Sequence, residues 1–283
     1  MPILQELVRR LEGISALDKV AKPLTALVGR AVQPRPVRNL LSGTNLGHPL
    51  HPMLTDVPIG AWTMSALLDT VGGPEAEPAA DLLVGAGILG AVPTAASGLN
   101  DWSDTIGPDR RVGMVHAGAN VAALALYVAS LIARRQGYRD RGRALGLAGL
   151  GVLVGGAYLG GHLSFATGVN VNHTAFEHRP GQWTPVLADA DLADGEHRKA
   201  LAGETPVLLY RHGGQVLALS ETCSHAGGPL DEGDFANGCV TCPWHGSTFR
   251  LADGTIVRGP ASAPQPAYDA RVRDGQIEVR ART

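Results

Sequence analysis

All three cysteines of this 283-residue chain lie in one stretch, ETCSHAGGPLDEGDFANGCVTCPWHGSTF, at residues 221–249. Cys223 is followed two residues later by His225, and Cys242 three residues later by His245. Thiolates and imidazoles bind zinc and iron, and glycines let backbone approach a metal centre closely. The stretch therefore predicts a metal centre held by two loops, each of which supplies one sulfur and one nitrogen.

Two kinds of metal centre fit these residues. Two thiolates and two imidazoles make a tetrahedral zinc site, but a zinc finger usually pairs Cys with Cys and His with His. Here each loop is mixed, which favours a two-iron cluster in which both cysteines hold one iron and both histidines hold the other. We expect the cluster, with zinc as the alternative.

The segments CSHAGGPL and CPWHGSTF resemble the paired cluster-binding boxes of Rieske [2Fe–2S] proteins. Residues 183–283 resemble one whole Rieske domain. The resemblance implies that Cys223 and Cys242 ligate a buried ferric iron, and that His225 and His245 ligate the outer, redox-active iron. Imidazoles in place of thiolates raise the reduction potential of such a cluster. One-electron transfer is the activity that the resemblance implies.

The same resemblance assigns two residues that tune the cluster. Ser247 matches a serine that donates a hydrogen bond to a bridging sulfide, and Phe249 stands where respiratory Rieske proteins have a tyrosine that bonds a cluster cysteine. The respiratory proteins also join their boxes by a disulfide, for which this chain has only Gly228, or a neighbour, and Trp244. We therefore expect a potential between the respiratory and the ferredoxin types. Cys239 is expected to be a small buried residue and not a ligand.

The elements that carry the two loops are expected to be short β-strands. Three apolar, alternating segments contain hairpin signals: Gly-Gly at 213–214 and Asp-Gly at 253–254 and 274–275. Such dipeptides favour tight turns between antiparallel strands. The C-terminal part is therefore predicted to be a small all-β domain of about seven strands, with the Cys/His stretches in neighbouring loops.

The N-terminal half is apolar and predicts a different class of structure. Four stretches approach the ~20 residues that cross a bilayer: Leu54–Gly73, Ala79–Leu99, Val112–Ala133 and Ala144–Ala166. The last two contain no charged residue. We expect a four-helix transmembrane bundle over 48–170, with a buried soluble bundle as the alternative, and a linker at 171–182. Residues 1–47 form an N-terminal segment whose apolar face predicts an amphipathic helix: Ile3, Leu7, Leu11, Ile14 and Leu17.

Polar residues inside the expected spans point to a second functional site, because such residues are costly in lipid. Near the ends that share one side lie His48, His51, Asp56, His116 and His162. We expect haem b, a quinone or a purely structural role for them. The segment also resembles an uncharacterised four-helix bacterial membrane domain that starts with HPxHP and is often fused to Rieske domains.

Composition excludes several functions. A net charge of −2 argues against a nucleic-acid partner. Only 38 residues follow His245 and none is histidine, so a Rieske oxygenase site has no ligands there. We expect a multi-pass protein of the bacterial cytoplasmic membrane whose Rieske domain is cytoplasmic. It would exchange electrons with donor and acceptor proteins or with quinone. The alternative is a membrane-anchored Rieske ferredoxin or redox sensor whose helices are structural.

Overall fold

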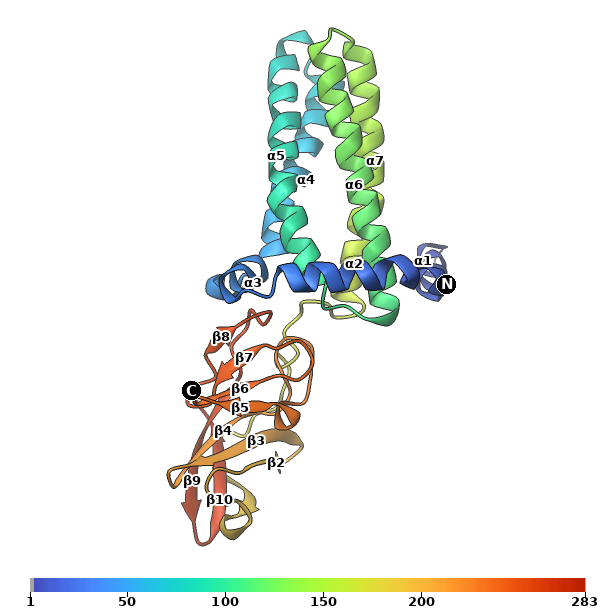
Figure 1. Ribbon diagram of the computed structural model, residues 1–283. Coiled ribbons are helices and arrows are strands. Elements are labelled where there is room, and N and C mark those ends of the chain that lie inside the picture. Colours follow the sequence, from blue (N-terminus) through green and yellow to red (C-terminus); the bar gives the residue numbers. More distant parts are fainter. Residues whose placement is uncertain (1–2, 283) are drawn as a thin grey trace. The chain divides into compact units, whose positions relative to one another are not determined.

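The computed structural model describes residues 3–282 and contains two units, each assembled from two separate stretches of chain (Figure 1). Within the described residues, the helical unit comprises 3–34 together with 50–169, and the β unit comprises 35–49 together with 170–282. The N-terminal segment that was expected as one piece over 1–47 is thus divided after Pro34. The short stretch 35–49, which includes α3 (Arg35–Ser42), belongs to the β unit.

The helical unit is built on four long antiparallel helices. They are α4 (Leu50–Val71), α5 (Glu77–Trp102), α6 (Gly107–Arg135) and α7 (Arg139–Phe165). Three helical segments between residues 3 and 282 are long and apolar enough to cross a membrane, namely Pro74–Trp102, Gly107–Arg135 and Arg139–Phe165. The expectation of four such spans is therefore wrong in number. The helix α4 falls short because His51, Asp56 and Asp69 interrupt its apolar run.

The N-terminal amphipathic pattern forms a bent pair of helices instead of one helix through Leu17. The helix α1 (Ile3–Gly13) ends at a glycine, and α2 (Asp18–Ala31) follows after one turn of 3₁₀-helix at Ser15–Leu17. Arg111 of α6 holds the bend, because its guanidinium donates to the Asp18 carboxylate at 2.8 and 3.0 Å and to the Glu12 carbonyl at 2.6 Å. The outer face of α1 leaves apolar side chains exposed: Ile3, Leu4 and Leu7.

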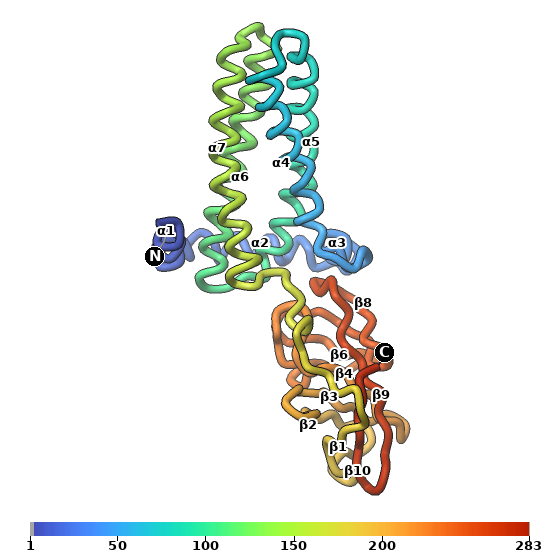
Figure 2. Tube along the Cα trace, turned by 180° about the vertical axis from the view of Figure 1, so that it is seen from behind, coloured from blue at the N-terminus to red at the C-terminus, as the bar shows by residue number. Residues whose placement is uncertain are grey.

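The hairpin α4–α5 and the hairpin α6–α7 are two copies of one pattern. Residues of α4 correspond to residues of α6 that lie 65 positions later, which matches His51 with His116 and Asp69 with Arg134. Residues of α5 correspond to residues of α7 that lie 62 positions later, as Gly87 does to Gly149. The hairpins lie together at the α4–α5 and α6–α7 turns and diverge towards the opposite end, as both views show (Figures 1 and 2).

Equivalent residues of the two copies meet in pairs along the bundle. Trp62 stacks on Tyr127 with ring centroids 4.0 Å apart, and Asp69 forms an ion pair with Arg134. The two serines that are equivalent, Ser65 and Ser130, each donate to a backbone carbonyl of the following helix, at 3.0 and 2.6 Å. Such self-pairing is what a two-fold relation between hairpins produces. The bundle is therefore an internal dimer of helical hairpins.

A buried ionic network closes the end of the bundle where the hairpins meet. Arg134 and Asp69 are 1% and 4% exposed, and Arg134 also contacts Asp81 at 2.9 Å. Arg139 reaches Asp69 at 2.9 Å and Asp81, so two guanidinium groups face two carboxylates. Buried charges need such partners, since an unpaired one would lack both water and a counter-ion.

The β unit consists of two antiparallel sheets. The first has six strands in the order β1-β10-β9-β4-β3-β2, and the second has four in the order β5-β6-β7-β8. Their bounds are β1 (Thr184–Ala188), β2 (His197–Ala202), β3 (Thr205–His212), β4 (Gln215–Ser220), β5 (Asp234–Ala236), β6 (Cys239–Thr241), β7 (Thr248–Arg250), β8 (Ile256–Arg258), β9 (Ala267–Arg273) and β10 (Gln276–Ala281). The all-β class is confirmed, with ten strands in place of about seven. Several of them have only three residues, which is too short for an alternating pattern to reveal.

The three predicted hairpin turns are present. Gly213 and Gly214 join β3 to β4 with φ of 59° and 79°, and Asp274 and Gly275 join β9 to β10 with φ of 52° and 74°. Positive φ at both central residues matches the right-handed twist of the flanking strands. The third turn, between β7 and β8, includes Gly254. The four-stranded sheet and the cysteines share one buried core, with Leu230, Val240 and Phe249 at its centre.

Candidate metal centre

The two Cys/His loops are built alike. The first follows β4, and the second is the β6–β7 turn. In each, the cysteine N–H donates to the carbonyl five residues later, Gly228 or Ser247, at 2.9 and 2.8 Å. In each, the cysteine carbonyl accepts from a glycine four residues later, Gly227 or Gly246, at 2.9 and 3.1 Å. Those two glycines have φ of 75° and 73°, a conformation that favours glycine.

This shared geometry brings the two cysteines together and the two histidines together. Cys223 and Cys242 are both buried and hydrogen-bonded sulfur to sulfur. The His225 and His245 rings meet edge to face with centroids 5.1 Å apart, and both are half-buried. The loops approach closely at Gly228, where a Cβ atom would lie 2.9 Å from the Cys242 sulfur.

The arrangement fits a two-metal cluster. Within residues 3–282, no group of three or more His, Cys, Asp or Glu side chains converges on one ion position. A [2Fe–2S] cluster requires only two side chains at each iron, and here the two sulfurs lie together and the two imidazoles lie together. The donor set and its pairing therefore match such a cluster.

The electrostatics of the loops favour the ligand forms of Cys242 and His225 and disfavour the thiolate of Cys223. The hydrogen bond from the Cys223 thiol, opposed by burial and assisted by the backbone N–H groups of Trp244 and His245, lowers the pKa of Cys242 to about 7. The same sulfur–sulfur hydrogen bond, followed by burial, raises the pKa of Cys223. Burial, followed by His245, lowers the pKa of His225 to about 3, which keeps its imidazole neutral.

Around the loops, Ser247 and Phe249 are fully buried. The Ser247 hydroxyl accepts the Ala261 N–H at 3.0 Å, which leaves its own hydrogen to donate. Phe249 lies in the same buried core as both ligand cysteines. Cys239 is half-buried in β6. Trp244 is 56% exposed, next to the ligand loop.

A second pair of histidines lies inside the helical unit. His51 near the start of α4 and His116 of α6 are 6.4 Å apart between ring centroids, edge to face. The Nδ1 of His51 lies 3.0 Å from the Thr94 carbonyl, and the Nδ1 of His116 lies 2.7 Å from the Gly156 carbonyl. A carbonyl can only accept, so each Nδ1 carries the hydrogen and each Nε2 keeps a lone pair.

Each ring of this pair lies on a glycine of the next helix. A Cβ atom at Gly98 would lie 2.6 Å from the His51 ring, and one at Gly160 would lie 3.0 Å from the His116 ring. The Asn120 amide is 3.2 Å from the His116 Nε2. The pair, its carbonyls and its glycines repeat with the spacing of the two hairpins, so both imidazoles are presented in the same way.

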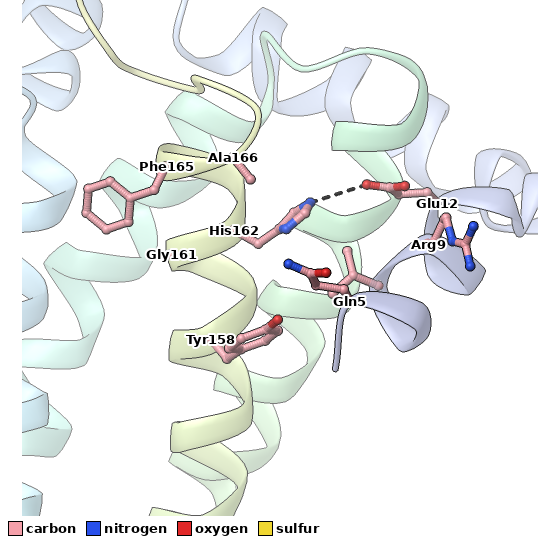
Figure 3. A pocket seen from close by; sticks show the side chains of 9 residues that line it. Gln5, Arg9, Glu12, Tyr158, Gly161, His162, Phe165 and Ala166 are labelled. Carbon is pink, nitrogen blue, oxygen red and sulfur yellow. Dashed lines mark hydrogen bonds and ion pairs between the residues drawn. The ribbon is translucent and has the colours of Figure 1, made fainter. Parts of the chain in front are cut away.

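His162 is not part of that pair and lies in a cavity between α1 and α7 (Figure 3). Its Nε2 is 3.2 Å from the Glu12 carboxylate, as the dashed line shows. Gln5 points in from α1, Arg9 lies at the rim on the same helix, and Tyr158 comes from the α7 side. The cavity has a volume of about 590 Å³, and its other lining residues are mostly apolar.

The remaining two residues of the expected membrane site are exposed. Asp56 lies on the outer face of α4, and His48 precedes α4 in the stretch that belongs to the β unit.

The sequence reasoning missed two features that surround the candidate sites: the hairpin repeat and the role of residues 35–49. A comparison of 50–102 with 115–164 at the two spacings would have found the repeat from His51 and His116.

Comparison with known families gives two matches. Residues 182–269 match the Rieske [2Fe–2S] domain, and residues 47–173 match a family described as a predicted membrane protein, DUF2231. The chain is 33% identical over 98 residues to the anthranilate 1,2-dioxygenase ferredoxin subunit of Burkholderia cepacia, covering 35% of this chain and 91% of that one. It is 32% identical over 90 residues to the cytochrome b6-f complex iron-sulfur subunit of Chlorobaculum tepidum, covering 32% of this chain and 49% of that one.

Among solved structures, the ferredoxin of carbazole 1,9a-dioxygenase from Nocardioides aromaticivorans is similar to the β unit. It has 29% sequence identity and a TM-score of 0.34, and the match covers 36% of this chain and 99% of the ferredoxin.

Proposed function

This chain belongs to the Rieske [2Fe–2S] domain proteins and carries a membrane domain, and we propose that it moves single electrons between redox partners at a bacterial membrane. The observation that carries the proposal is the pairing of the two loops, sulfur with sulfur and imidazole with imidazole. When bound, a cluster of this type supplies a reversible one-electron couple. The relatives named as ferredoxin and iron-sulfur subunits support electron transfer as the activity.

In this proposal the four ligands have separate tasks. Cys223 and Cys242, buried below the loops, hold the inner iron as thiolates. His225 and His245, half-buried at the loop surface, hold the outer iron and offer the route by which an electron leaves. A potentiometric titration of the purified protein should give a reversible one-electron curve. A two-electron curve, or bleaching that reoxidation fails to reverse, would contradict the proposal.

We further propose that the helical unit holds a second redox group, haem b, between His51 and His116. His51 and His116 would hold the haem iron, and metal–imidazole bonds of about 2 Å require that the two rings lie within several ångströms of each other. The observed 6.4 Å supports such ligation. The backbone carbonyls that accept from both Nδ1 atoms leave both Nε2 atoms as the nitrogens that would bind the iron, with the Asn120 amide, now 3.2 Å from the His116 Nε2, giving way.

Quinone is the second candidate, and the cavity of Figure 3 favours it at a different place. An apolar cavity of about 590 Å³ with a His162–Glu12 pair suits a ring with hydroxyl or carbonyl groups at its ends. A quinol bound there would donate hydrogen bonds to acceptors among these side chains. Binding of a short-chain quinone analogue should weaken in His162→Ala and remain in His116→Ala. The reverse order would assign the quinone to the histidine pair.

The proposal places the β unit in the cytoplasm. Seven basic residues precede Leu40, and Arg110 and Arg111 follow α5, whereas the α6–α7 turn region holds five arginines: Arg134, Arg135, Arg139, Arg141 and Arg143. The α1 side therefore carries more basic residues than the α6–α7 turn. This supports a cytoplasmic α1 side, because cytoplasmic segments of membrane proteins are enriched in Lys and Arg. A C-terminal fusion to green fluorescent protein should fluoresce, and one to alkaline phosphatase should be inactive. The opposite pair of results would reverse the orientation.

A further inference from the structure

Residues 35–49 precede the membrane domain in the sequence, but they pack with the β unit. Asn39 of α3 pairs with the backbone around β8: its amide donates to the Val257 carbonyl at 3.3 Å and accepts from the Gly259 N–H at 2.8 Å. Thr44 donates to the Ala261 carbonyl at 2.9 Å. The fit is close, because a Cβ atom at Gly259 would lie 2.6 Å from the Thr44 hydroxyl.

The backbone that receives these bonds also holds the second ligand loop. The Ala261 N–H donates to the Ser247 hydroxyl at 3.0 Å, and Arg258 donates to the Gly246 carbonyl at 2.9 Å. A continuous set of hydrogen bonds therefore runs from α3 through residues 257–261 to the loop that carries Cys242 and His245.

The stretch that follows the membrane domain holds the first ligand loop in a similar way. The His173 N–H donates to the Ser224 carbonyl at 3.0 Å, between Cys223 and His225. Four residues after His173, the Glu177 carboxylate accepts a hydrogen bond of 2.7 Å from the hydroxyl of Ser220, at the end of β4. Both ligand loops are thus attached to the stretches that flank the membrane domain.

The helix α3 brings a buried positive charge to this region. Arg38, next to Asn39, is 4% exposed, and a guanidinium stays charged at every ordinary pH. Its neighbour Asn39 bonds the backbone on both sides of Arg258, and the Arg258 guanidinium bonds the Gly246 carbonyl beside His245, so α3 places Arg38 near the second ligand loop. Arg35, one turn earlier on the same helix, is exposed.

We infer that residues 35–49 belong functionally to the Rieske domain, where they support the second ligand loop, and that Arg38 raises the reduction potential of the cluster. Reduction adds one negative charge to the cluster, and a fixed cation on the helix that supports the second ligand loop stabilises that charge. Because Arg38 is buried, salt screens its effect far less than that of an exposed arginine. The inference rests on the proposed function, since it requires the cluster at Cys223, His225, Cys242 and His245.

The test is a redox titration of the full-length protein, followed by the EPR signal of the reduced cluster, in Arg38→Gln, Arg38→Lys and Arg35→Gln. We expect Arg38→Gln to lower the equilibrium constant for reduction of the cluster about tenfold. For a one-electron couple this corresponds to a reduction potential that is about 59 mV lower. The difference should persist in high salt. Arg38→Lys keeps the charge and should stay close to wild type, and Arg35→Gln is the matched control on the same helix.

Equal potentials in Arg38→Gln and Arg35→Gln would overturn the inference. If Arg38→Gln fails to retain a cluster, Arg38→Lys decides: a retained cluster with wild-type potential supports the need for the cation, whereas loss in both variants assigns Arg38 to packing alone and contradicts the inference. A wild-type protein without a Rieske signal would instead overturn the proposed function, before any variant is compared.

Discussion

His51 and His116 occupy equivalent positions in two copies of a helical hairpin, and their rings meet with centroids 6.4 Å apart. Each donates from Nδ1 to a carbonyl of the next helix and lies on a glycine there. The two imidazoles are therefore presented in the same way, and the haem proposal starts from this arrangement.

The haem proposal predicts a spectrum that depends on this pair and not on His162. Protein made with ample haem should show a sharp α-band in the reduced-minus-oxidised spectrum. His51→Ala and His116→Ala should each remove the band, because each deletes one of the two imidazoles that would hold the haem. His162→Ala should keep it, since that side chain pairs with Glu12 elsewhere in the unit. A band that survives both substitutions of the pair would exclude it as the haem site.

Packing at the middle of the bundle predicts opposite effects for two glycines of α5. A Cβ atom at Gly87 would lie 2.2 Å from the Trp62 ring, so Gly87→Ala should displace the Trp62–Tyr127 stack and cost roughly 1–3 kcal/mol. Gly85 has no such neighbour within 4 Å, and Gly85→Ala should stabilise the helix by about 0.5–1 kcal/mol. Thermal unfolding in detergent measures both. Equal shifts would show that the stack does not limit the space at Gly87.

The ion pair between Asp69 and Arg134 predicts a rescue by charge exchange. Asp69→Arg alone places like charges together in a buried network, and Arg134→Asp does the same with carboxylates, so each should cost roughly 3–5 kcal/mol. The double variant restores opposite charges at equivalent positions and should be more stable than the sum of the single effects allows. Arg135→Gln, at an exposed neighbour, serves as the control. Strict additivity would mean that the two residues do not act as a pair.

The buried residues beside the ligand loops predict changes in potential of opposite sign. Phe249→Tyr should raise the cluster potential, because a hydroxyl at this buried position can donate to a ligand sulfur. Ser247→Ala should lower it by removing a donor. The same change leaves the Ala261 N–H without its acceptor, which costs about 1–3 kcal/mol. Redox titration and thermal unfolding report the two effects separately. An unchanged potential in both variants would mean that neither position bonds the cluster sulfurs.

Local chemistry explains how much of this structure the sequence could predict. The candidate metal ligands could be proposed because Cys and His are rare and their spacing is characteristic, and the hairpins could be predicted because Gly-Gly and Asp-Gly favour positive φ. The pairing of His51 with His116 was harder to predict, since it depends on how two hairpins pack and not on either one alone. The role of residues 35–49 was hidden for a similar reason: Asn39 bonds Gly259 across 220 positions of sequence, and no local pattern encodes such a contact.

Low-temperature EPR of the dithionite-reduced, purified full-length protein, with metal analysis of the same sample, tests whether the paired loops hold a Rieske cluster. We predict about two irons per chain and a signal whose average g lies well below that of an all-cysteine ferredoxin. His225→Ala and Cys242→Ala should abolish the signal, whereas Cys239→Ala should retain it. Stoichiometric zinc without iron, or an all-cysteine type of signal that survives His225→Ala, would contradict the assignment of the site.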